Sequence, residues 1–311
     1  VDAWKSVQQL NPRNPEIATH LATALVNAGK SSEARDVIKT ALALAPNDMR
    51  LSFLMAQAQR DEGDLDGALS TARSLRDAHP EDPRATYLLG QMLLAKSRYD
   101  EVVELIKPEL DRLRGANGAG AQMALLETTE GAALLQLKRN DEAIALLKDA
   151  AGRAPDDTTV LFQYGAALDR AGRTADAEKT FRDVIAKDPL DAGALNYLGY
   201  MLAEHGASLE EAVALIQRAL NVEPNNPSYL DSLGWAYVQQ GKLDLAEPAL
   251  TTAAEKLPTN SVIQDHLGDL RLKQNRRADA IAAWQKALAG DMDAVDRAKL
   301  QKKIDAARKG K

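Results

Sequence analysis

Residues 227–258, PSYLDSLGWAYVQQGKLDLAEPALTTAAEKLP, decide the fold of this chain. Apolar residues recur every three or four positions on both sides of the polar turn at Gly241, which is the spacing of one apolar face on each of two helices. The glycine suits the end of the first helix, and Pro258 closes the second because proline cannot continue a helix. The stretch therefore predicts an amphipathic helical hairpin.

The same pattern returns along the chain at a nearly constant period. Helix-ending prolines lie 34 residues apart in three pairs, which are Pro46 and Pro80, Pro155 and Pro189, and Pro224 and Pro258. The residue that opens the second helix of each hairpin repeats in step, at Ala34, Ala68, Val102, Ala143, Ala177, Ala212, Ala246 and Ala280. These markers predict about eight hairpins, starting near Pro15, Met49, Pro83, Ala124, Thr158, Ala192, Pro227 and Ser261.

Stacking of these hairpins is the only way to bury their apolar faces, because a single hairpin cannot do so. Aromatic residues make up only 4% of the chain, and Ala and Leu are abundant, as short and closely packed helices require. Strand-forming residues are comparatively sparse, so a β core is not expected. The fold class predicted from the residues is all-α.

The hairpin resembles the tetratricopeptide repeat (TPR). Its best copy has the family pattern at Leu230, Leu233, Gly234, Tyr237, Ala246, Leu250, Ala253 and Pro258. Other copies contain Leu161, Gly165, Leu168, Ala177, Phe181 and Pro189, and Leu267, Gly268, Ala280, Trp284 and Ala287. The resemblance implies a right-handed superhelical solenoid of about eight TPR hairpins, whose first helices line a concave groove that binds a protein or an extended peptide.

The period divides the chain into five parts. Residues 1–14 read as the second helix of a truncated repeat, 15–114 as hairpins one to three, and 121–291 as hairpins four to eight. Residues 292–311 are expected to cap the array, with Leu300, Ile304 and Ala307 facing inward. The third hairpin is irregular, since Glu109 replaces a small residue and the Gly-rich segment 115–120 follows, either as a loop or as a hinge.

Composition argues against several kinds of partner. A net charge of −6 and a pI near 5.4 provide no basic surface for phosphates, so nucleic acid is not expected. No apolar run is long enough to insert directly into a bilayer, and there is no cysteine for a disulfide or a thiolate metal site. Val1 is not a natural start, so we expect that any signal or lipid anchor has been removed, and the oligomeric state stays open.

Catalytic motifs are missing from the sequence. The histidines His20, His79, His205 and His266 fall in four different repeats, without the paired spacing of metal ligands. No P-loop, nucleophile elbow or dinucleotide fingerprint is present. We therefore expect a non-catalytic protein that uses no cofactor and no metal.

Candidate groove residues lie on the first helix of each hairpin, one turn apart, on the side away from the seam. They are Asn196, Tyr200, Asp231, Trp235, Asp265 and Asp269, together with Phe162, Tyr87 and Phe53. Tyr200 and Trp235 each follow a packing glycine, so they either anchor a partner or pack against the neighbouring hairpin. The acidic residues and Asn196 either hold backbone donors and basic side chains of a peptide or form a solvated face.

A narrower resemblance covers residues 192–289, which are similar to a group of Gram-negative bacterial envelope proteins. That group includes outer-membrane lipoproteins that act as adaptors for periplasmic proteases or cell-wall enzymes. The resemblance implies a scaffold or adaptor in the bacterial periplasm, tethered to the outer membrane, with a cytoplasmic location as the alternative.

Two other functional hypotheses remain open from the sequence. The first is the regulatory TPR portion of a larger enzyme or of a polysaccharide-export or secretion machine. The second is a sensor of a small ligand or cation that uses Asp231, Asp265 and Asp269.

Overall fold

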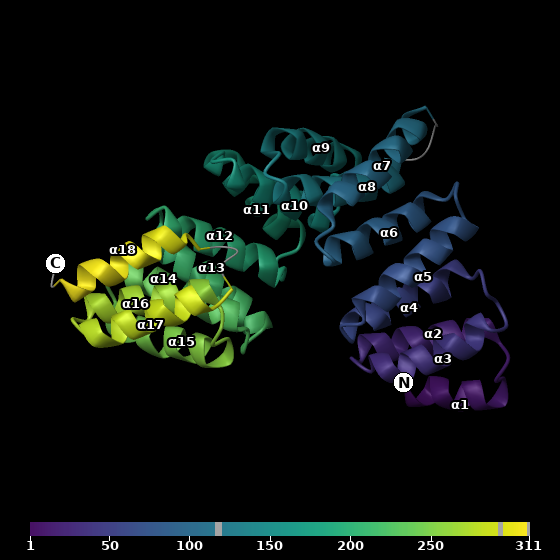
Figure 1. Cartoon of the computed structure of the whole chain (residues 1–311), viewed down its shortest axis with the longest axis horizontal. Coiled ribbons are helices and arrows are strands. Elements are labelled where there is room, and N and C mark those ends of the chain that lie inside the picture. Colours follow the sequence, from purple (N-terminus) through teal and green to yellow (C-terminus); the bar gives the residue numbers. More distant parts are fainter. Residues whose placement is uncertain (116–119, 292–294, 310–311) are drawn as a thin grey trace. The chain divides into compact units, whose positions relative to one another are not determined.

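The computed structural model describes residues 1–115, 120–291 and 295–309. Within these ranges the regular elements are α-helices, and the only β-structure is an isolated bridge between Asn260 and Asp291. Figure 1 shows these helices arranged as stacked pairs within each part of the chain. The predicted all-α solenoid of helical hairpins is confirmed.

The chain forms two compact units, residues 1–177 and 178–311. Unit 1 contains α1 (Asp2–Leu10), α2 (Pro15–Asn27), α3 (Ser31–Leu42), α4 (Met49–Asp61), α5 (Leu65–Ala78), α6 (Pro83–Ala95), α7 (Tyr99–Arg114), α8 (Gly120–Gln136), α9 (Asn140–Arg153) and α10 (Thr158–Arg170). The division falls within α11 (Thr174–Lys187). Unit 2 continues with α12 (Ala192–Glu204), α13 (Leu209–Val222), α14 (Pro227–Gln239), α15 (Leu243–Lys256), α16 (Ser261–Lys273), α17 (Arg277–Ala289) and α18 (Arg297–Arg308).

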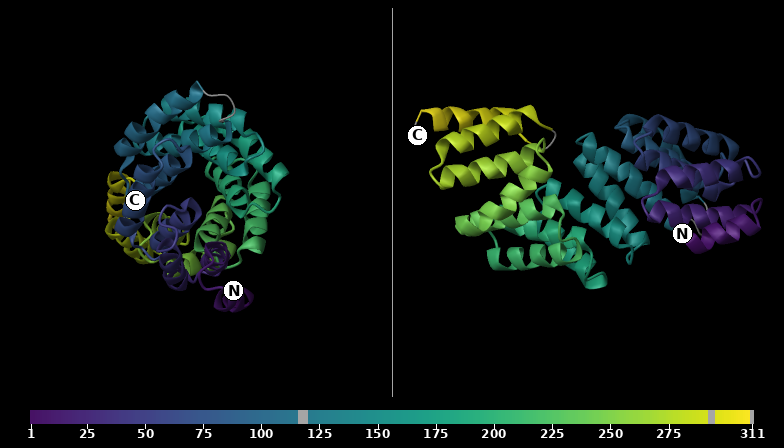
Figure 2. Two further views of the ribbon diagram at one scale, coloured as in Figure 1. Left: turned by 90° about the vertical axis from the view of Figure 1, so that its right-hand side faces the viewer. Right: turned by 90° about the horizontal axis from the view of Figure 1, so that it is seen from below.

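Hairpins stack in chain order inside each unit. In unit 2, α12 packs on α13, α14 on α15 and α16 on α17, while the first helices α12, α14 and α16 also pack on one another in sequence. Unit 1 repeats this arrangement through α2, α4, α6, α8 and α10. The gradual change of colour from one helical pair to the next within each unit in Figure 2 shows the same order.

The starts of the hairpins are set by side-chain caps. Asp or Asn precedes most first helices and accepts hydrogen bonds from the free N–H groups of the first turn, at Asn14, Asp48, Asp82, Asp157, Asp191, Asn226 and Asn260. Seven predicted starts are therefore met, at Pro15, Met49, Pro83, Thr158, Ala192, Pro227 and Ser261. The start near Ala124 was wrong, because α8 begins at Gly120 and the helix-forming residues Ala121, Gln122 and Met123 extend it.

Close approach of the two helices of a hairpin depends on glycine. A Cβ atom on Gly234 would lie 2.5 Å from Cγ of Leu250, and one on Gly268 would lie 2.3 Å from Nε1 of Trp284. Both distances are shorter than any real side-chain contact, so the packing role predicted for these glycines is confirmed.

Substitution of Gly234 by alanine tests this packing. Gly234→Ala is expected to lower the free energy of unfolding by about 1–3 kcal/mol, because Leu250 must move. Gly152→Ala in α9 is the matched control, since nothing lies within 4 Å of its Cβ position and alanine favours a helix. Urea unfolding followed by circular dichroism measures both, and equal stability of the two variants would contradict the packing role.

The ends of the array are covered by single helices. In unit 1, α1 packs on α2, and the ring of Trp4 stacks on His20 with centroids 4.7 Å apart. In unit 2, Leu300, Ile304 and Ala307 of α18 are buried, as the capping helix predicts. The rest of the expected cap at 292–294 and 310–311 lies outside the described residues.

The irregular third hairpin lies within unit 1. Most of the expected loop or hinge at 115–120 lies outside the described residues, which resume at Gly120. On its far side α8 packs on both α6 and α7, so unit 1 continues across the segment to residue 177. Glu109 is buried there, and its carboxylate accepts a hydrogen bond of 2.6 Å from Arg112, which compensates the charge.

Candidate functional site

A groove of about 580 Å³ runs over the first helices of unit 2. Its walls come from α12, α14, α16 and the start of α18, and its lining mixes polar and apolar surface. The residues that line it are Asn196, Tyr197, Tyr200, Glu204, Ser228, Asp231, Ser232, Asn260, Val262, Ile263, Asp265, His266, Val295, Asp296 and Lys299.

The repeat places these side chains in rows. Asn196, Asp231 and Asp265 occupy the same position of three successive first helices, and Tyr200 and Glu204 follow Asn196 at intervals of one turn. Because the three helices pack on one another in order, equivalent residues come side by side. The structure thus brings together four of the predicted site residues, namely Asn196, Tyr200, Asp231 and Asp265.

A buried pair of Asp231 and His266 forms part of the groove lining. Nδ1 of His266 lies 3.0 Å from both carboxylate oxygens of Asp231, and the two residues are only 6% and 5% exposed. Burial opposes the charged imidazole, but the carboxylates of Asp231, Asp265 and Asp269 together hold the pKa of His266 above its usual value. The carboxylate of Asp231 therefore favours the charged form of His266 in the groove.

Aromatic side chains surround this histidine. The ring of Trp235 stacks on His266 with centroids 4.3 Å apart and planes 14° apart, and the ring of Tyr200 is tilted at 6.2 Å. Nε1 of Trp235 donates a hydrogen bond of 2.8 Å to Glu204. Trp235 thus packs against the next repeat and fixes Glu204, whereas Tyr200 lines the groove. Burial and the nearby Glu204 carboxylate raise the pKa of Tyr200, so its hydroxyl stays protonated.

Asn196 presents an unused hydrogen-bond acceptor. Its side-chain oxygen Oδ1 is buried and has no hydrogen-bond partner among the described residues, although the residue lines the groove. A buried polar atom without a partner costs free energy that a ligand can recover. A backbone N–H group of a bound peptide would supply the missing donor.

The other predicted acidic residues contact the capping helix. Nζ of Lys303 in α18 donates to Asp265 at 2.6 Å and to Asp269 at 2.8 Å. Asp269 also accepts a hydrogen bond of 3.2 Å from Nε1 of Trp284. A fully solvated acidic face is therefore wrong for Asp231, Asp265 and Asp269, because folding supplies each of them with a cationic partner.

Phe53, Tyr87 and Phe162 belong to unit 1 and are half-buried. Phe53 and Tyr87 pack against the apolar core of that unit, and burial raises the pKa of Tyr87. Phe53 also lines a separate apolar hollow of about 400 Å³ with Thr19, Thr23, Met49, Arg50, Leu54 and Arg84.

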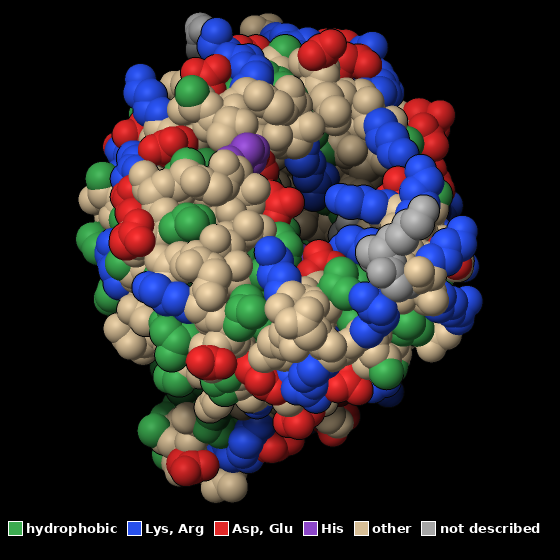
Figure 3. All heavy atoms as spheres, turned by 90° about the vertical axis from the view of Figure 1, so that its left-hand side faces the viewer, with side chains coloured by type: hydrophobic (Ala, Val, Ile, Leu, Met, Phe, Trp, Pro, Cys, Tyr) green, Lys and Arg blue, Asp and Glu red, His purple; other side chains and the backbone are tan. Residues whose placement is uncertain are grey.

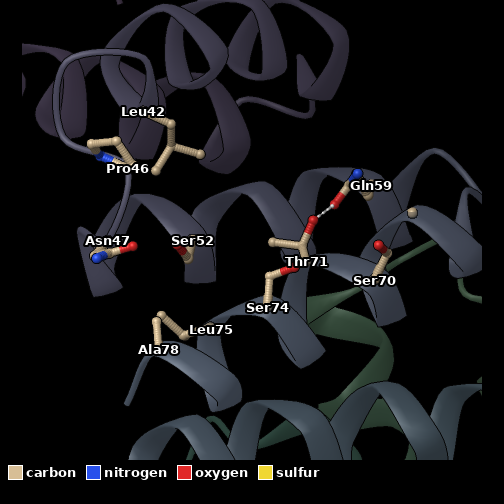
Figure 4. Close-up of a pocket in the computed structure, with 11 residues that line it drawn as sticks. Leu42, Pro46, Asn47, Ser52, Gln59, Ser70, Thr71, Ser74, Leu75 and Ala78 are labelled. Atoms are coloured by element: carbon tan, nitrogen blue, oxygen red, sulfur yellow. Dashed lines mark hydrogen bonds between the residues drawn. The ribbon is translucent and has the colours of Figure 1, made fainter.

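A second hollow of unit 1, about 350 Å³, is drawn in Figure 4. Hydroxyl groups of Ser70, Thr71 and Ser74 from α5 face it, and Thr71 donates a hydrogen bond of 2.8 Å to the side-chain oxygen of Gln59. No charged side chain lines it. This hollow contains none of the residues predicted for the site.

Metal ligation finds no support in the described residues, since no group of three or more His, Cys, Asp and Glu is placed to hold an ion. The cation sensor that the sequence left open, built on Asp231, Asp265 and Asp269, is therefore not supported. Among the helices described, none combines the length and apolar character that crossing a bilayer requires.

The sequence reasoning missed His266 and Lys303. His266 stands 35 residues after Asp231, close to one repeat, which is the separation at which side chains of adjacent first helices meet. That spacing was a usable signal for the pair. Lys303 gave no such signal, because its ion pairs with Asp265 and Asp269 depend on how α18 packs against α16.

Models of the tetratricopeptide repeat family match residues 3–58, 51–187 and 165–229 of the chain. The matches overlap and together cover residues 3–229, which is most of the chain. They include the first groove helix, α12, and the start of α14.

Two bacterial relatives share the repeat. A TPR repeat-containing protein of Pseudomonas aeruginosa is 33% identical over 205 residues, covering 64% of this chain and 33% of that protein. Cellulose synthase operon protein C of Pseudomonas fluorescens is 23% identical over 192 residues, covering 61% of this chain and 15% of that protein. The chain thus spans a third or less of the length of these relatives.

Solved TPR structures have the same fold. The crystal structure of an APC/C hetero-tetramer superposes with a TM-score of 0.71 at 16% identity, covering 98% of this chain and 58% of that chain. A thermophilic TPR protein of Thermus thermophilus superposes with a TM-score of 0.52 at 24% identity, covering 60% of this chain and 98% of that one. The repeat pattern, the stacked hairpins and the matched family models agree, and the chain belongs to the tetratricopeptide repeat family.

Proposed function

We propose that the groove of unit 2 holds an extended segment of a partner protein. TPR arrays are scaffolds for protein–protein interaction, and this chain has the family's stacked first helices. The observation that carries the proposal is the acceptor of Asn196, which has no partner within residues 1–115, 120–291 and 295–309, in an open groove of about 580 Å³. A main-chain N–H group satisfies that acceptor, and Tyr200 beside it offers an aromatic ring and a protonated hydroxyl.

Charge on the surface favours polar recognition. On the face drawn in Figure 3, Lys and Arg side chains are interspersed with Asp and Glu, and hydrophobic side chains form small separate patches. In the groove itself, Asp231 is neutralised by His266, and Asp265 by Lys303. Glu204, Asp296 and Lys299 remain as charged groups at the rim, where they contribute to orientation more than to affinity.

Groove binding is tested with peptides selected from a random display library on the full chain. Asn196→Ala is expected to weaken the selected peptides about tenfold, which is the effect of one lost hydrogen bond in a desolvated site. Tyr200→Ala should weaken them further. Leu245→Ala is the control, because Leu245 is 51% exposed on α15 and does not line the groove.

Dissociation constants from fluorescence anisotropy decide the outcome. The proposal requires that Leu245→Ala binds as tightly as the unchanged chain. Equal affinities for all the variants would place binding outside the groove.

The partner class is proposed from sequence resemblance. Residues 192–289 are similar to Gram-negative envelope proteins, so we propose a non-catalytic adaptor for a periplasmic protease or a cell-wall enzyme, held in the periplasm at the outer membrane. The bacterial relative that is 33% identical supports a bacterial origin of this repeat arrangement. Fractionation of the native host tests the location, since recovery of the protein in the cytoplasm would refute it.

A second candidate is the regulatory TPR portion of a larger enzyme or of a polysaccharide-export machine. The observation in its favour is the similarity to cellulose synthase operon protein C over 61% of this chain. The complete gene separates the two candidates. A signal followed by a lipid-attachment cysteine supports the adaptor, and a large additional domain supports the machine.

A further inference from the structure

Glu130 of α8 occupies a position that is leucine in most other repeats. The residue before the packing glycine is Leu89, Leu198, Leu233 and Leu267 in other repeats, and Tyr164 in another. Gly131 fixes the alignment of this repeat, because a Cβ atom there would lie 2.7 Å from Cγ of Leu147. An ionisable carboxyl group thus stands where other repeats carry an apolar or aromatic side chain.

The side chain of Glu130 is largely buried, with 7% of the residue exposed. Its carboxyl group has no hydrogen-bond or ion-pair partner within the described residues, and it borders a cavity instead of being sealed from solvent. Glu127, one turn earlier and fully buried, accepts two hydrogen bonds of 3.1 Å from Nε of Arg153. Glu109 is likewise paired with Arg112. Folding therefore compensates two of these three glutamates and leaves Glu130 free.

Glu130 lines a cavity of about 140 Å³ between α7, α8 and α9. This volume exceeds that of a few water molecules, so it suits a small polar group and not a length of peptide. The residues that line it are Lys107, Leu110, Arg114, Glu130, Leu134, Arg139, Glu142 and Leu146.

The charges around the cavity are mainly positive. Lys107 and Arg114 come from α7, with Asp111 beside Arg114 at 2.6 Å. Arg139 precedes α9 and holds Glu142 through two hydrogen bonds of 2.7 Å. The other helices packed on α8, which are α6 and α10, bring no charged side chain to the lining. With Glu130 neutral, the three cations face two anions, Asp111 and Glu142, so the net charge around the cavity is positive and favours an anion.

The protonation state of Glu130 suits an anion. Burial raises its pKa to about 7, against the opposing effect of Lys107, Arg114 and Arg139. Below that pH the carboxyl group is neutral and carries an O–H donor, which an apolar side chain at this position lacks.

We propose that this pocket binds a single carboxylate group of a protein partner, with the protonated carboxyl of Glu130 donating a hydrogen bond to it and Lys107 and Arg114 balancing its charge. Glu130 keeps its proton throughout. The site lies in unit 1, shares no residue with the groove of unit 2, and does not depend on the function proposed for that groove.

Two capped tripeptides test the site on the full chain, acetyl-Gly-Asp-Gly-amide and its Asn counterpart, titrated by nuclear magnetic resonance. The Asp peptide is expected to bind about tenfold more weakly at pH 8 than at pH 6, because a group with a pKa of about 7 loses its proton over that range. The Asn peptide should not bind. Equal binding of both peptides would overturn the proposal, and acetate binding as tightly as the Asp peptide would overturn the assignment to a protein partner.

Two substitutions of Glu130 show whether a loss of Asp-peptide binding comes from lost recognition or from a loss of folding. Glu130→Leu restores the leucine of other repeats, so it should fold and lose the Asp peptide. Glu130→Gln keeps a neutral donor, so it should bind the Asp peptide with little change between pH 6 and pH 8. Full binding by Glu130→Leu, or an unchanged pH dependence in Glu130→Gln, would show that Glu130 does not recognise the carboxylate.

Discussion

Replacement of Trp284 by alanine is expected to lower the free energy of unfolding by about 3–5 kcal/mol. Trp284 is fully buried beneath Gly268, where its side chain fills the space between α16 and α17. Alanine leaves a cavity at that point, since the backbone of Gly268 has no side chain with which to fill it.

The same substitution affects the capping helix. Nε1 of Trp284 donates to Asp269, and Nζ of Lys303 lies 5.8 Å from the ring centroid of Trp284. The loss of the indole thus removes one partner of Asp269 and an aromatic surface beneath Lys303. We expect α18 to become less protected together with α16 and α17.

Hydrogen exchange and urea unfolding measure this effect. Trp284→Phe is the matched variant, because it keeps an aromatic ring and loses the N–H donor, and its cost should be clearly smaller. An alanine variant as stable as the unchanged chain would show that the seam at Gly268 does not support unit 2.

The second large effect on the free energy of unfolding is expected from removal of the Asp231 carboxylate. Asp231→Ala leaves His266 buried without its counter-charge, and breaking a buried pair in this way costs about 3–5 kcal/mol. Asp231→Asn keeps the size of the side chain and removes only the charge, so it isolates the electrostatic part. The loss should be measured at about pH 6, where the histidine of the unchanged chain is protonated.

The raised pKa of His266 determines whether the stability lost in Asp231→Asn grows or shrinks with pH. The pKa of His266 is raised in the folded chain, so the pair contributes its full stability below the unfolded value of 6.5 and loses it as the pH rises through the folded value. The stability difference between the unchanged chain and Asp231→Asn should therefore shrink as the pH is raised above about 6.5. A difference that is constant or that grows with pH would contradict a cationic His266.

The fold could be predicted because the same helical-hairpin pattern recurs many times along the sequence. Most hairpins carry at least two of three features, a cap, a packing glycine and a closing proline, as in Asn226, Gly234 and Pro258. The prediction failed at the fourth hairpin, where the sequence has no Asp or Asn directly before Ala124 to mark the start and α8 is already helical at Gly120. The boundary between the two units within α11 had no sequence signal, because the hairpin pattern around Ala177 is regular.

The groove was predictable only in part. Helical spacing placed Asn196, Tyr200 and Asp231 on one surface, since these positions follow from the period alone. The partners of the acidic residues depend on which helices pack together, so Lys303 could not be inferred. Glu130 could have been found by aligning the repeats, because the residue before each packing glycine is otherwise apolar or aromatic.

Site-specific photo-crosslinking tests the central claim, that the first helices of unit 2 hold a partner segment, most directly. A photoreactive amino acid placed at Ser228 on α14 faces the groove, and one at Leu245 on α15 lies outside it. In the native host, a discrete protein adduct is expected from position 228 and should be lost when Asn196→Ala is added. The same adduct from position 245, or an adduct at 228 that is unchanged by Asn196→Ala, would contradict binding in the groove.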